Sequence, residues 1–446
     1  MTQASASATA DLAPPPTGFG RALLVKTIGN AGLNAATLVL NLAIALLLSH
    51  FLGPRGYGAY AFAVAWATLL AVPALLGLPM LVVREVAAAR VNETWGVMRG
   101  VIRRSNQGVL VAAAVVCGAM AVVVAATGWP APPLRTPTLI GLVLVPLVGI
   151  VSLRQSAMQG LGQVVLGRTP EGLVNPLLVI AGIVALRLAL GDRLSAGSTV
   201  AVAVGAAATA AVLGARLLRR ALPRAARDAE PVYATRAWAM TALPLMLMGA
   251  ISTANDQLGT IFVGALGSAR EVGVFAVASR AASLIPFLLL AAVPTLMPSV
   301  VELHTRKDIE KLQHLLTRAA RIVFYASTPI VIGVIVLAAP LLRVFGADFV
   351  DGATPLRILA IGQIVNIATG FPGMALIMIR EAGKVTRIVA CGTVANVLLC
   401  ALLIPKFGAS GAATAGATSI ALTNVLLSAV LWRTNRLWSP AFAAPR

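Results

Sequence analysis

Charged residues are scarce in this chain of 446 residues, since Asp, Glu, Lys and Arg make up only 11% of it. Soluble proteins carry about 25%. Hydrophobic residues make up 59%, and the mean hydropathy is +0.90. Such a chain has too few polar groups to cover a surface in water. The composition therefore excludes a water-soluble globular protein and predicts a polytopic membrane protein.

Cysteines, aromatic residues and catalytic motifs are also few or missing. The three cysteines, Cys117, Cys391 and Cys400, lie in apolar stretches and form neither a disulfide framework nor a zinc pattern. The sequence contains no H-E-x-x-H, no G-x-S-x-G and no G-x-x-x-x-G-K-[ST]. The loops are too short to hold an extramembrane catalytic domain. We therefore expect no enzyme, no cofactor and no metal site.

Twelve apolar stretches are long enough to cross a hydrocarbon layer of about 30 Å. The fold class that they predict is an all-α membrane protein with twelve transmembrane helices. Residues 1–20, rich in Ala, Ser, Thr and Pro, are expected to be a disordered cytoplasmic tail. Residues 433–446 are expected to be a second cytoplasmic tail. The stretches are 28–49, 58–83, 108–127, 138–159, 172–190, 196–215, 240–264, 272–298, 322–341, 354–378, 388–404 and 410–432.

The positive charge follows the ends of these stretches. A net charge of +20 would indicate nucleic-acid binding in a soluble protein. Here 26 basic residues fall on the side of the first terminus and seven on the other side. Cytoplasmic loops of membrane proteins carry this excess of Lys and Arg. We therefore expect both termini in the cytoplasm, a place in the cytoplasmic (inner) membrane of a bacterium, and no nucleic-acid partner.

The two halves of the chain resemble each other weakly. Residues 51–63 read FLGPRGYGAYAFA and residues 265–278 read ALGSAREVGVFAVA. This similarity predicts a lobe of six helices over 21–215 and a second over 240–432, joined by a basic cytoplasmic linker over 216–239. Repeats with an even number of spans have parallel topology. The matched pairs are Gly53 with Gly267, Gly58 with Gly273, Asn41 with Asn255, and Asn175 with Asn396.

Several polar residues lie inside the apolar stretches and are candidates for a site. An asparagine there is better explained by hydrogen bonding between helices than by a site. A charged side chain costs several kcal/mol in hydrocarbon, so Asp256 and Arg280 should face a cavity or each other. For Asp256 three roles stay open: an ion pair with Arg280, a coupling acid, and a passive polar lining. The polar residues are Asn30, Asn34, Asn41, Asn255, Asp256, Gln257, Arg280, Gln363 and Asn366.

Residues 48–87 resemble the opening of polysaccharide-transporter-type flippases. These belong to the multidrug/oligosaccharidyl-lipid/polysaccharide exporter superfamily and include the O-antigen and exopolysaccharide flippases. Their pattern is a Gly-Pro-x-x-Tyr-Gly turn, a Gly-Leu segment and an arginine. VGVFAVASR (272–280) and IPKFGASGAATA (404–415) extend the resemblance into the second half. The matching residues are Gly53, Pro54, Tyr57, Gly58, Gly77, Leu78 and Arg84.

This resemblance implies a function as well as a fold. It implies two six-helix lobes around a central cavity that opens alternately to each side. It also implies a polyprenyl-pyrophosphate-linked oligosaccharide as cargo, with membrane lipids, polysaccharide assembly proteins and a coupling cation, proton or sodium, as partners. Arg280 and Arg84 are the candidates for binding the pyrophosphate, Asn41 and Asn255 are further candidates for the substrate, and Asp256 is the candidate for coupling.

Three other functions compete with this one. A cation-coupled multidrug exporter of the same superfamily would share the fold, but we expect it to carry more intramembrane acids and aromatics. A peptidoglycan-precursor flippase usually has two additional helices, for which this chain has no room. A membrane enzyme acting on glycans is disfavoured by the short loops.

Overall fold

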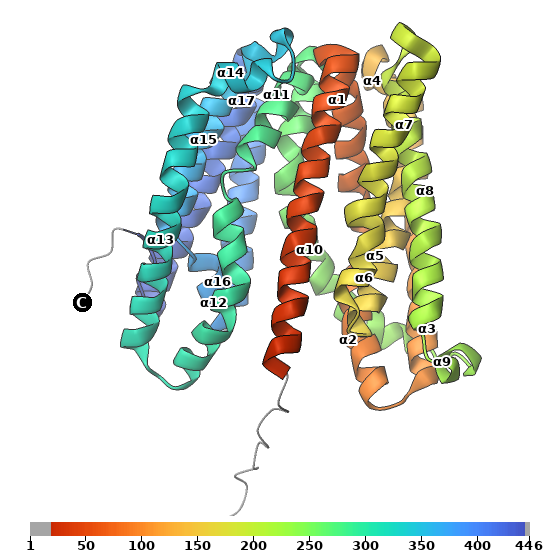
Figure 1. Cartoon of the computed structure of the whole chain (residues 1–446), viewed down its shortest axis with the longest axis vertical. Coiled ribbons are helices and arrows are strands. Elements are labelled where there is room, and N and C mark those ends of the chain that lie inside the picture. The colour runs from red at the N-terminus through yellow and green to blue at the C-terminus, as the bar shows by residue number, and fades with distance from the viewer. Residues whose placement is uncertain (1–18, 442–446) are drawn as a thin grey trace, which may run out of the picture.

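The computed structural model describes residues 19–441 and is built of helices packed as two bundles (Figure 1). The first bundle holds α1 Phe19–Leu75, α2 Leu78–Val91, α3 Trp95–Thr127, α4 Pro132–Gly141, α5 Leu144–Gly160, α6 Val164–Thr169, the π-helical turn Pro170–Val174, α7 Asn175–Leu190, the 3-10 turn Gly191–Arg193 and α8 Ala196–Ala221. After the short α9 Arg224–Asp228 and α10 Thr235–Leu266, the second holds α11 Ala269–Ala282, α12 Phe287–Thr305, α13 Ile309–Val336, α14 Ala338–Arg343, the 3-10 turn Ala347–Gly352, α15 Ala353–Thr369, α16 Pro372–Met378 and α17 Ala382–Asn435.

In the described part of the chain, eight helical segments are long and apolar enough to cross a membrane. The number is nine if the bent pair around Gly370, whose two helices meet at 43°, is one span. An all-helical membrane fold is therefore confirmed. The expected tail over 1–20 falls mostly outside the described residues, and Phe19 and Gly20 already belong to α1, which corrects its boundary.

The two longest helices are each bent at a glycine. Gly53 in α1 has φ 63° and Gly408 in α17 has φ 54°, and helical geometry continues on both sides. Positive φ is costly for other residues, so glycine is required at such a bend. Pro54 follows the first bend directly, and its ring is incompatible with the carbonyl of a straight preceding turn. The Gly-Pro turn thus divides α1 into two helical segments that meet at a bend.

The two bundles meet where helices cross at small residues. A Cβ atom on Gly58 of α1 would lie 1.8 Å from the Ala269 carbonyl oxygen of α11. A Cβ atom on Gly273 would lie 2.0 Å from the Pro54 carbonyl oxygen. The contact is therefore reciprocal, and each glycine admits the backbone of the other helix. Below it the bundles draw apart, toward the end at which α1 begins (Figure 1).

α10 connects the two bundles along its length. Near its start Trp238 is buried among side chains of α2 and α3, in one hydrophobic cluster with Val86 and Met98. Toward its end Val263 is fully buried in a different cluster with Ile404 of α17. The sequence pattern predicts this helix as part of the second lobe alone. Its first turns in fact pack on the first bundle, because the chain arrives there from α8 and α9.

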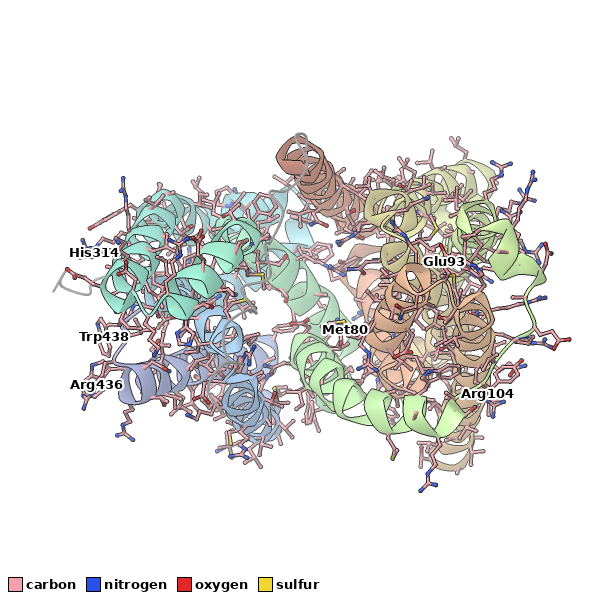
Figure 2. All side chains as sticks on the ribbon, turned by 90° about the horizontal axis from the view of Figure 1, so that it is seen from below. Met80, Glu93, Arg104, His314, Arg436 and Trp438 are labelled. Atoms are coloured by element: carbon pink, nitrogen blue, oxygen red, sulfur yellow. The ribbon has the colours of Figure 1, made fainter. Side chains whose placement is uncertain are left out.

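The chain after α17 folds back into the second bundle. The Ser439 hydroxyl donates to the Thr369 carbonyl (2.8 Å) and the Ala441 N–H donates to the Ala368 carbonyl (2.9 Å). Both carbonyls belong to the last turn of α15, where helical partners are missing because the chain breaks at Gly370. Seen from below, Arg436 and Trp438 lie at the edge of the second bundle near His314 (Figure 2). The segment thus completes the end of a broken helix.

We expect Leu437→Ala to lower the free energy of unfolding by about 2–5 kcal/mol, the usual loss for a buried leucine. Leu437 is 0% exposed and packs in the hydrophobic cluster of the second bundle, which holds the returning segment in place. The measurement is unfolding of the purified protein in detergent by denaturant titration. Leu402→Ala is the matched control, because Leu402 is 61% exposed on α17. Equal losses in both variants would contradict a structural role for the returning segment.

Candidate functional site

A cavity of about 460 Å³ lies between the bundles, on the open side of the Gly58–Gly273 contact. Three helices line it: α1 on both sides of its bend, α10 and α11. Its volume is in the range of sites for small ligands or headgroups. Unlike most such sites it is rich in polar groups, contributed by Asn41, Tyr57, Tyr60, Thr68, Asp256, Gln257, Thr260, Ser279, Arg280 and Ser283.

Arg280 is the basic side chain of this lining. Its guanidinium lies near the Tyr57 side chain, and both residues line the cavity. Tyr57 is itself only 4% exposed, stacks on Tyr60 with ring centroids 6.4 Å apart, and meets the edge of Phe349 at 6.2 Å. The phenols are neutral, so they leave the positive charge of Arg280 uncompensated. The arrangement can bind an anionic group, since guanidinium forms paired hydrogen bonds with phosphate.

Asp256 lines the same cavity from α10. No ion pair within 4.0 Å joins it to Arg280 among the described residues. Gln257 faces the cavity beside it, while Asn255 points elsewhere and accepts a hydrogen bond of 3.0 Å from the Asn396 side chain of α17. Consecutive helix residues point 100° apart, so this division was expected. The pairing, coupling and lining roles of Asp256 remain predictions.

The other candidates are divided between the cavity and the rest of the protein. Asn41 lines the cavity, and its amide donates to the Thr37 carbonyl (2.9 Å). Arg84 does not line it: the residue lies on α2, and its guanidinium pairs with the adjacent Glu85 at 2.8 Å. The structure thus brings together Arg280, Asp256 and Asn41. It places Arg84 and Asn255 with other partners.

The structure also identifies residues that sequence reasoning missed. The turn motif includes Tyr57 without a role in a site, although its spacing of three from Tyr60 already places both on one face. Sequence reasoning also missed a second carboxylate inside a helical segment long enough to span a membrane. Glu171 lies within the helical segment Val164–Ala189, at its π-helical turn, and is exposed there. The predicted apolar stretch begins at residue 172, one position too late.

The cavity walls on α1 and α11 are built from equivalent positions. Every lining residue on the second part of α1 beyond Tyr60 has a counterpart, on α11 or at its C-cap, that follows it by 215 positions. The same interval separates Gly58 from Gly273, which touch. The pairs are Ala61 with Ala276, Val64 with Ser279, Ala65 with Arg280, and Thr68 with Ser283. Within these four pairs the positions correspond, but α1 contributes one polar side chain and α11 with its C-cap contributes three.

Comparison with known proteins places the chain in a family. A model described as polysaccharide biosynthesis protein matches residues 23–304, which is more than half of the chain. The chain belongs to this family.

None of the described residues form a cluster of three His, Cys, Asp or Glu side chains able to hold a metal ion.

Two curated relatives from Haloferax volcanii match part of the chain. A probable flippase, AglR, is 24% identical over 172 residues, which are 38% of this chain and 36% of the relative. A probable low-salt glycan biosynthesis flippase, Agl15, is 25% identical over 165 residues, 37% of this chain and 35% of the relative. The match thus spans about a third of each relative. Both relatives are named as flippases rather than enzymes, which supports the expectation of a non-enzyme.

Solved structures share the fold of the chain. An inward-facing multidrug resistance MATE family transporter of the MOP superfamily aligns with a TM-score of 0.74 and 16% identity, covering 90% of this chain and 96% of that one. The lipid II flippase MurJ in an inward closed conformation aligns with 0.68 and 14%, covering 89% and 85%. At these identities the likeness concerns the fold alone.

Proposed function

We propose that this protein is a flippase that moves a polyprenyl-pyrophosphate-linked oligosaccharide across the cytoplasmic membrane for cell-surface polysaccharide synthesis. The observation that carries the proposal is the cavity between the bundles, where Arg280 offers a cation to a diphosphate and other polar side chains surround it. A glycan headgroup needs such a polar surface on its way through hydrocarbon, because each unsatisfied polar group there costs free energy. The family and the names of the two relatives agree with this cargo.

The proposal includes twelve spans in two halves that move relative to each other. The bends at Gly53 and Gly408 divide two of the long helices into two spans each. The consecutive helices α11 and α12 together, and the helix α10, supply further spans in this proposal. The Gly58–Gly273 contact closes one end of the cavity. Alternating access then requires this contact to open while the bundles approach each other at the other end.

Asp256 is the group that we propose for coupling transport to a cation. It is a carboxylate that lines the cavity, and the described residues offer it no basic partner within 4.0 Å. A carboxylate without a basic partner can bind a proton or another cation that enters the cavity. A cation bound there would give each half-cycle a different charge in the cavity.

The test of cargo uses the purified protein in proteoliposomes. A fluorescent polyprenyl-pyrophosphate-linked oligosaccharide placed in one leaflet should become accessible to a membrane-impermeant quencher on the other side at a rate that depends on the protein. Unglycosylated polyprenyl phosphate and a fluorescent organic cation serve as comparison substrates. Movement of the organic cation without movement of the glycolipid would favour the multidrug exporter and contradict the proposal.

The orientation is proposed from the basic residues, with both termini in the cytoplasm. Cysteines introduced near residue 225, on a cysteine-free background, should resist a membrane-impermeant maleimide in intact cells, and a cysteine at residue 132 should react. The reason is the excess of basic residues on the side of α9. The two curated relatives come from an archaeon, so the proposal concerns the cytoplasmic membrane and not a kind of cell. Reaction near residue 225 in intact cells would contradict it.

A further inference from the structure

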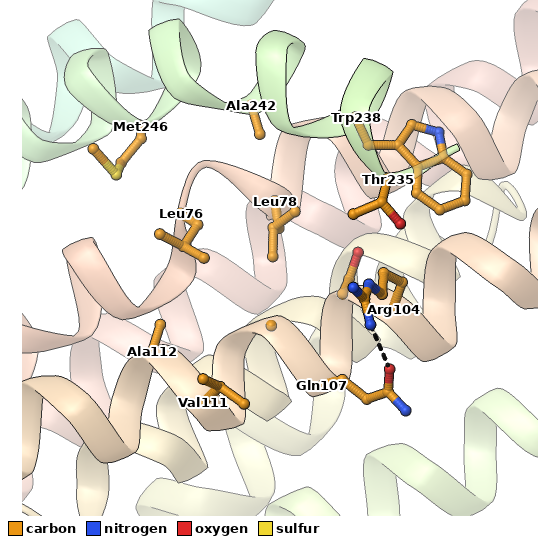
Figure 3. A pocket seen from close by; sticks show the side chains of 12 residues that line it. Leu76, Leu78, Arg104, Gln107, Val111, Ala112, Thr235, Trp238, Ala242 and Met246 are labelled. Atoms are coloured by element: carbon orange, nitrogen blue, oxygen red, sulfur yellow. Dashed lines mark hydrogen bonds between the residues drawn. The ribbon is translucent and has the colours of Figure 1, made fainter. Parts of the chain in front are cut away.

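A second pocket, of about 570 Å³, lies away from the central cavity, where the start of α10 crosses α3 and the break between α1 and α2 (Figure 3). Its walls are largely apolar, formed by Leu76 and Leu78 at the break, Val111 and Ala112 of α3, and Trp238 and Met246 of α10. It shares no residue with the central cavity. Nothing in the proposed transport of a glycan headgroup uses it.

One end of this pocket is polar and basic. Arg104, Ser105 and Gln107 of α3 and Thr235 of α10 are gathered there. The Arg104 guanidinium donates to the Gln107 side-chain oxygen at 3.4 Å, a neutral partner that leaves its charge uncompensated (Figure 3). None of the ion pairs found among the described residues includes it. Arg104 lies on the face seen from below in Figure 2, together with Glu93 just before α3.

The polar and apolar parts follow each other along one face of α3. Arg104, Gly108 and Ala112 are spaced by four residues, so they lie on the same side of the helix. Ala112 is about 12 Å farther along the axis than Arg104, at 1.5 Å per residue. Gly108 leaves room between them, since a Cβ atom there would meet only Leu78 at 3.6 Å. The pocket thus offers a charge at one level and an apolar channel at deeper levels.

We propose that this pocket binds an anionic phospholipid of the bilayer, with its phosphate at Arg104 and one acyl chain along Gly108 and Ala112 toward Met246. Charge complementarity selects the headgroup, because basic pockets between transmembrane helices at the arginine-rich face bind anionic lipids. The apolar walls favour binding of an acyl chain, because the chain supplies dispersion contacts that the walls lack when the pocket is empty. The site is independent of the transported cargo.

The position of the lipid ties it to the contact between the bundles. Gly77 at the α1–α2 break has φ 69°, and a Cβ atom on it would lie 2.2 Å from the Ala242 carbonyl oxygen of α10. Leu76 and Leu78 on either side of Gly77 line the pocket. A chain in the pocket therefore packs against both partners of this close contact. We expect the bound lipid to stabilise the association of α10 with the first bundle.

The test measures lipid binding to the purified full chain in non-ionic detergent. Phosphatidylglycerol and phosphatidylcholine with the same acyl chains are titrated, and bound lipid is counted by native mass spectrometry while thermal unfolding is followed. Wild-type protein should bind phosphatidylglycerol more tightly and unfold at a higher temperature with it. Arg104→Gln should weaken phosphatidylglycerol binding about fivefold, the factor for one basic residue near an anionic surface. Arg104→Lys should retain most of the preference.

Two further variants distinguish lipid binding in this pocket from lipid binding elsewhere on the protein. Arg103→Gln is the matched control, because Arg103 is exposed on the same turn of α3 but does not line the pocket. Ala112→Trp should fill the channel and remove binding of both lipids at this site, while the protein keeps its elution volume in gel filtration. If Arg103→Gln and Arg104→Gln weaken phosphatidylglycerol binding equally, the lipid is attracted by general surface charge, and the proposal is overturned. Binding of polyprenyl phosphate in preference to phosphatidylglycerol would assign the pocket to the cargo's chain and overturn it as well.

Discussion

Arg280→Ala should weaken binding of the lipid-linked oligosaccharide about 10- to 100-fold and abolish its transport at cellular concentrations. Hydrogen bonds to a charged group contribute about 1.5–3 kcal/mol each, and about 1.4 kcal/mol corresponds to a factor of ten. Arg280 is the basic residue in the described lining of the cavity, so no neighbour replaces it. Arg280→Lys should retain part of the activity, because an ammonium group keeps the charge without the paired geometry. The measurement is glycolipid binding and flipping in proteoliposomes.

Arg84→Ala is the informative comparison, since the sequence pattern indicates both arginines for the pyrophosphate. Arg84 pairs with Glu85 outside the cavity, and its side chain is 61% exposed. We expect Arg84→Ala to change glycolipid binding less than threefold. An exposed ion pair contributes about 0.6 kcal/mol, which corresponds to about that factor. A large loss in Arg84→Ala with normal folding, or normal flipping in Arg280→Ala, would show that the pyrophosphate is bound elsewhere.

The double variant Asp256→Asn/Arg280→Gln distinguishes the three roles of Asp256. If the two charges mainly neutralise each other in one conformation of the cycle, the double variant should fold and transport better than either single variant. If Asp256 couples transport to a cation, Asp256→Asn alone should fold but move glycolipid only down its gradient. Normal uphill transport by Asp256→Asn alone would leave the residue as a passive lining. The readout is flipping measured with and without an imposed proton or sodium gradient.

Gly58→Leu should produce the largest loss of stability among single substitutions in this chain. Extra atoms in a packed core cost about 1–3 kcal/mol when neighbours can adjust. At Gly58 the first added carbon already lies 1.8 Å from a backbone oxygen, so the helices must separate, and we expect a loss above that range. Gly273→Leu should behave in the same way. The measurement is the midpoint of thermal unfolding in detergent and the fraction of monodisperse protein.

The reciprocal geometry gives this prediction a sharper form. Once α1 and α11 have separated to admit one leucine, the second has less to displace, so the double variant should lose less than the sum of the single variants. Gly118→Leu is the matched control, because nothing lies within 4 Å of a Cβ atom at that glycine of α3. Additive losses for Gly58 and Gly273, or an equal loss at Gly118, would contradict a direct helix contact at these residues.

The class of fold was predictable because the lipid bilayer acts in the same way on every part of the chain. It requires long apolar segments within the hydrocarbon and leaves the arginines mostly at the ends of these segments. Gly53 was predicted as a turn from the Gly-Pro pair, and the structure confirms a bend with positive φ. The alignment of the halves matched Gly58 with Gly273, but a spacing of equivalent positions carries no information about contact. That the two glycines touch depends on the angle at which the bundles meet, which arises from packing along the whole length of α1 and α11.

The site was predictable only in part, for a similar reason. Arg280 and Asp256 were identifiable because a charge in hydrocarbon is costly and needs a cavity or a partner. Tyr57 and Tyr60 carry no such signal, since aromatic residues are ordinary in buried helices, so only their position beside Arg280 reveals a role. Arg84 was placed in the site through a family pattern, and the break at Gly77 instead directs α2 away from the cavity. Glu171 was missed because a hydropathy window ends at a carboxylate even where the helix continues.

The equivalence of the cavity walls has a consequence for how a headgroup is oriented. Lining residues of α1 correspond in position to lining residues at α11, and the two helices touch at Gly58 and Gly273. The pairs are Ala61 with Ala276, Val64 with Ser279, Ala65 with Arg280, and Thr68 with Ser283. A symmetric cavity would accept an asymmetric ligand in two orientations of equal free energy. Because Arg280 has Ala65 as its counterpart, the charge belongs to one wall and the two orientations differ in free energy. For the cargo proposed above, we expect the diphosphate to bind toward α11 and the attached sugars toward α1, so that every molecule enters in the same orientation.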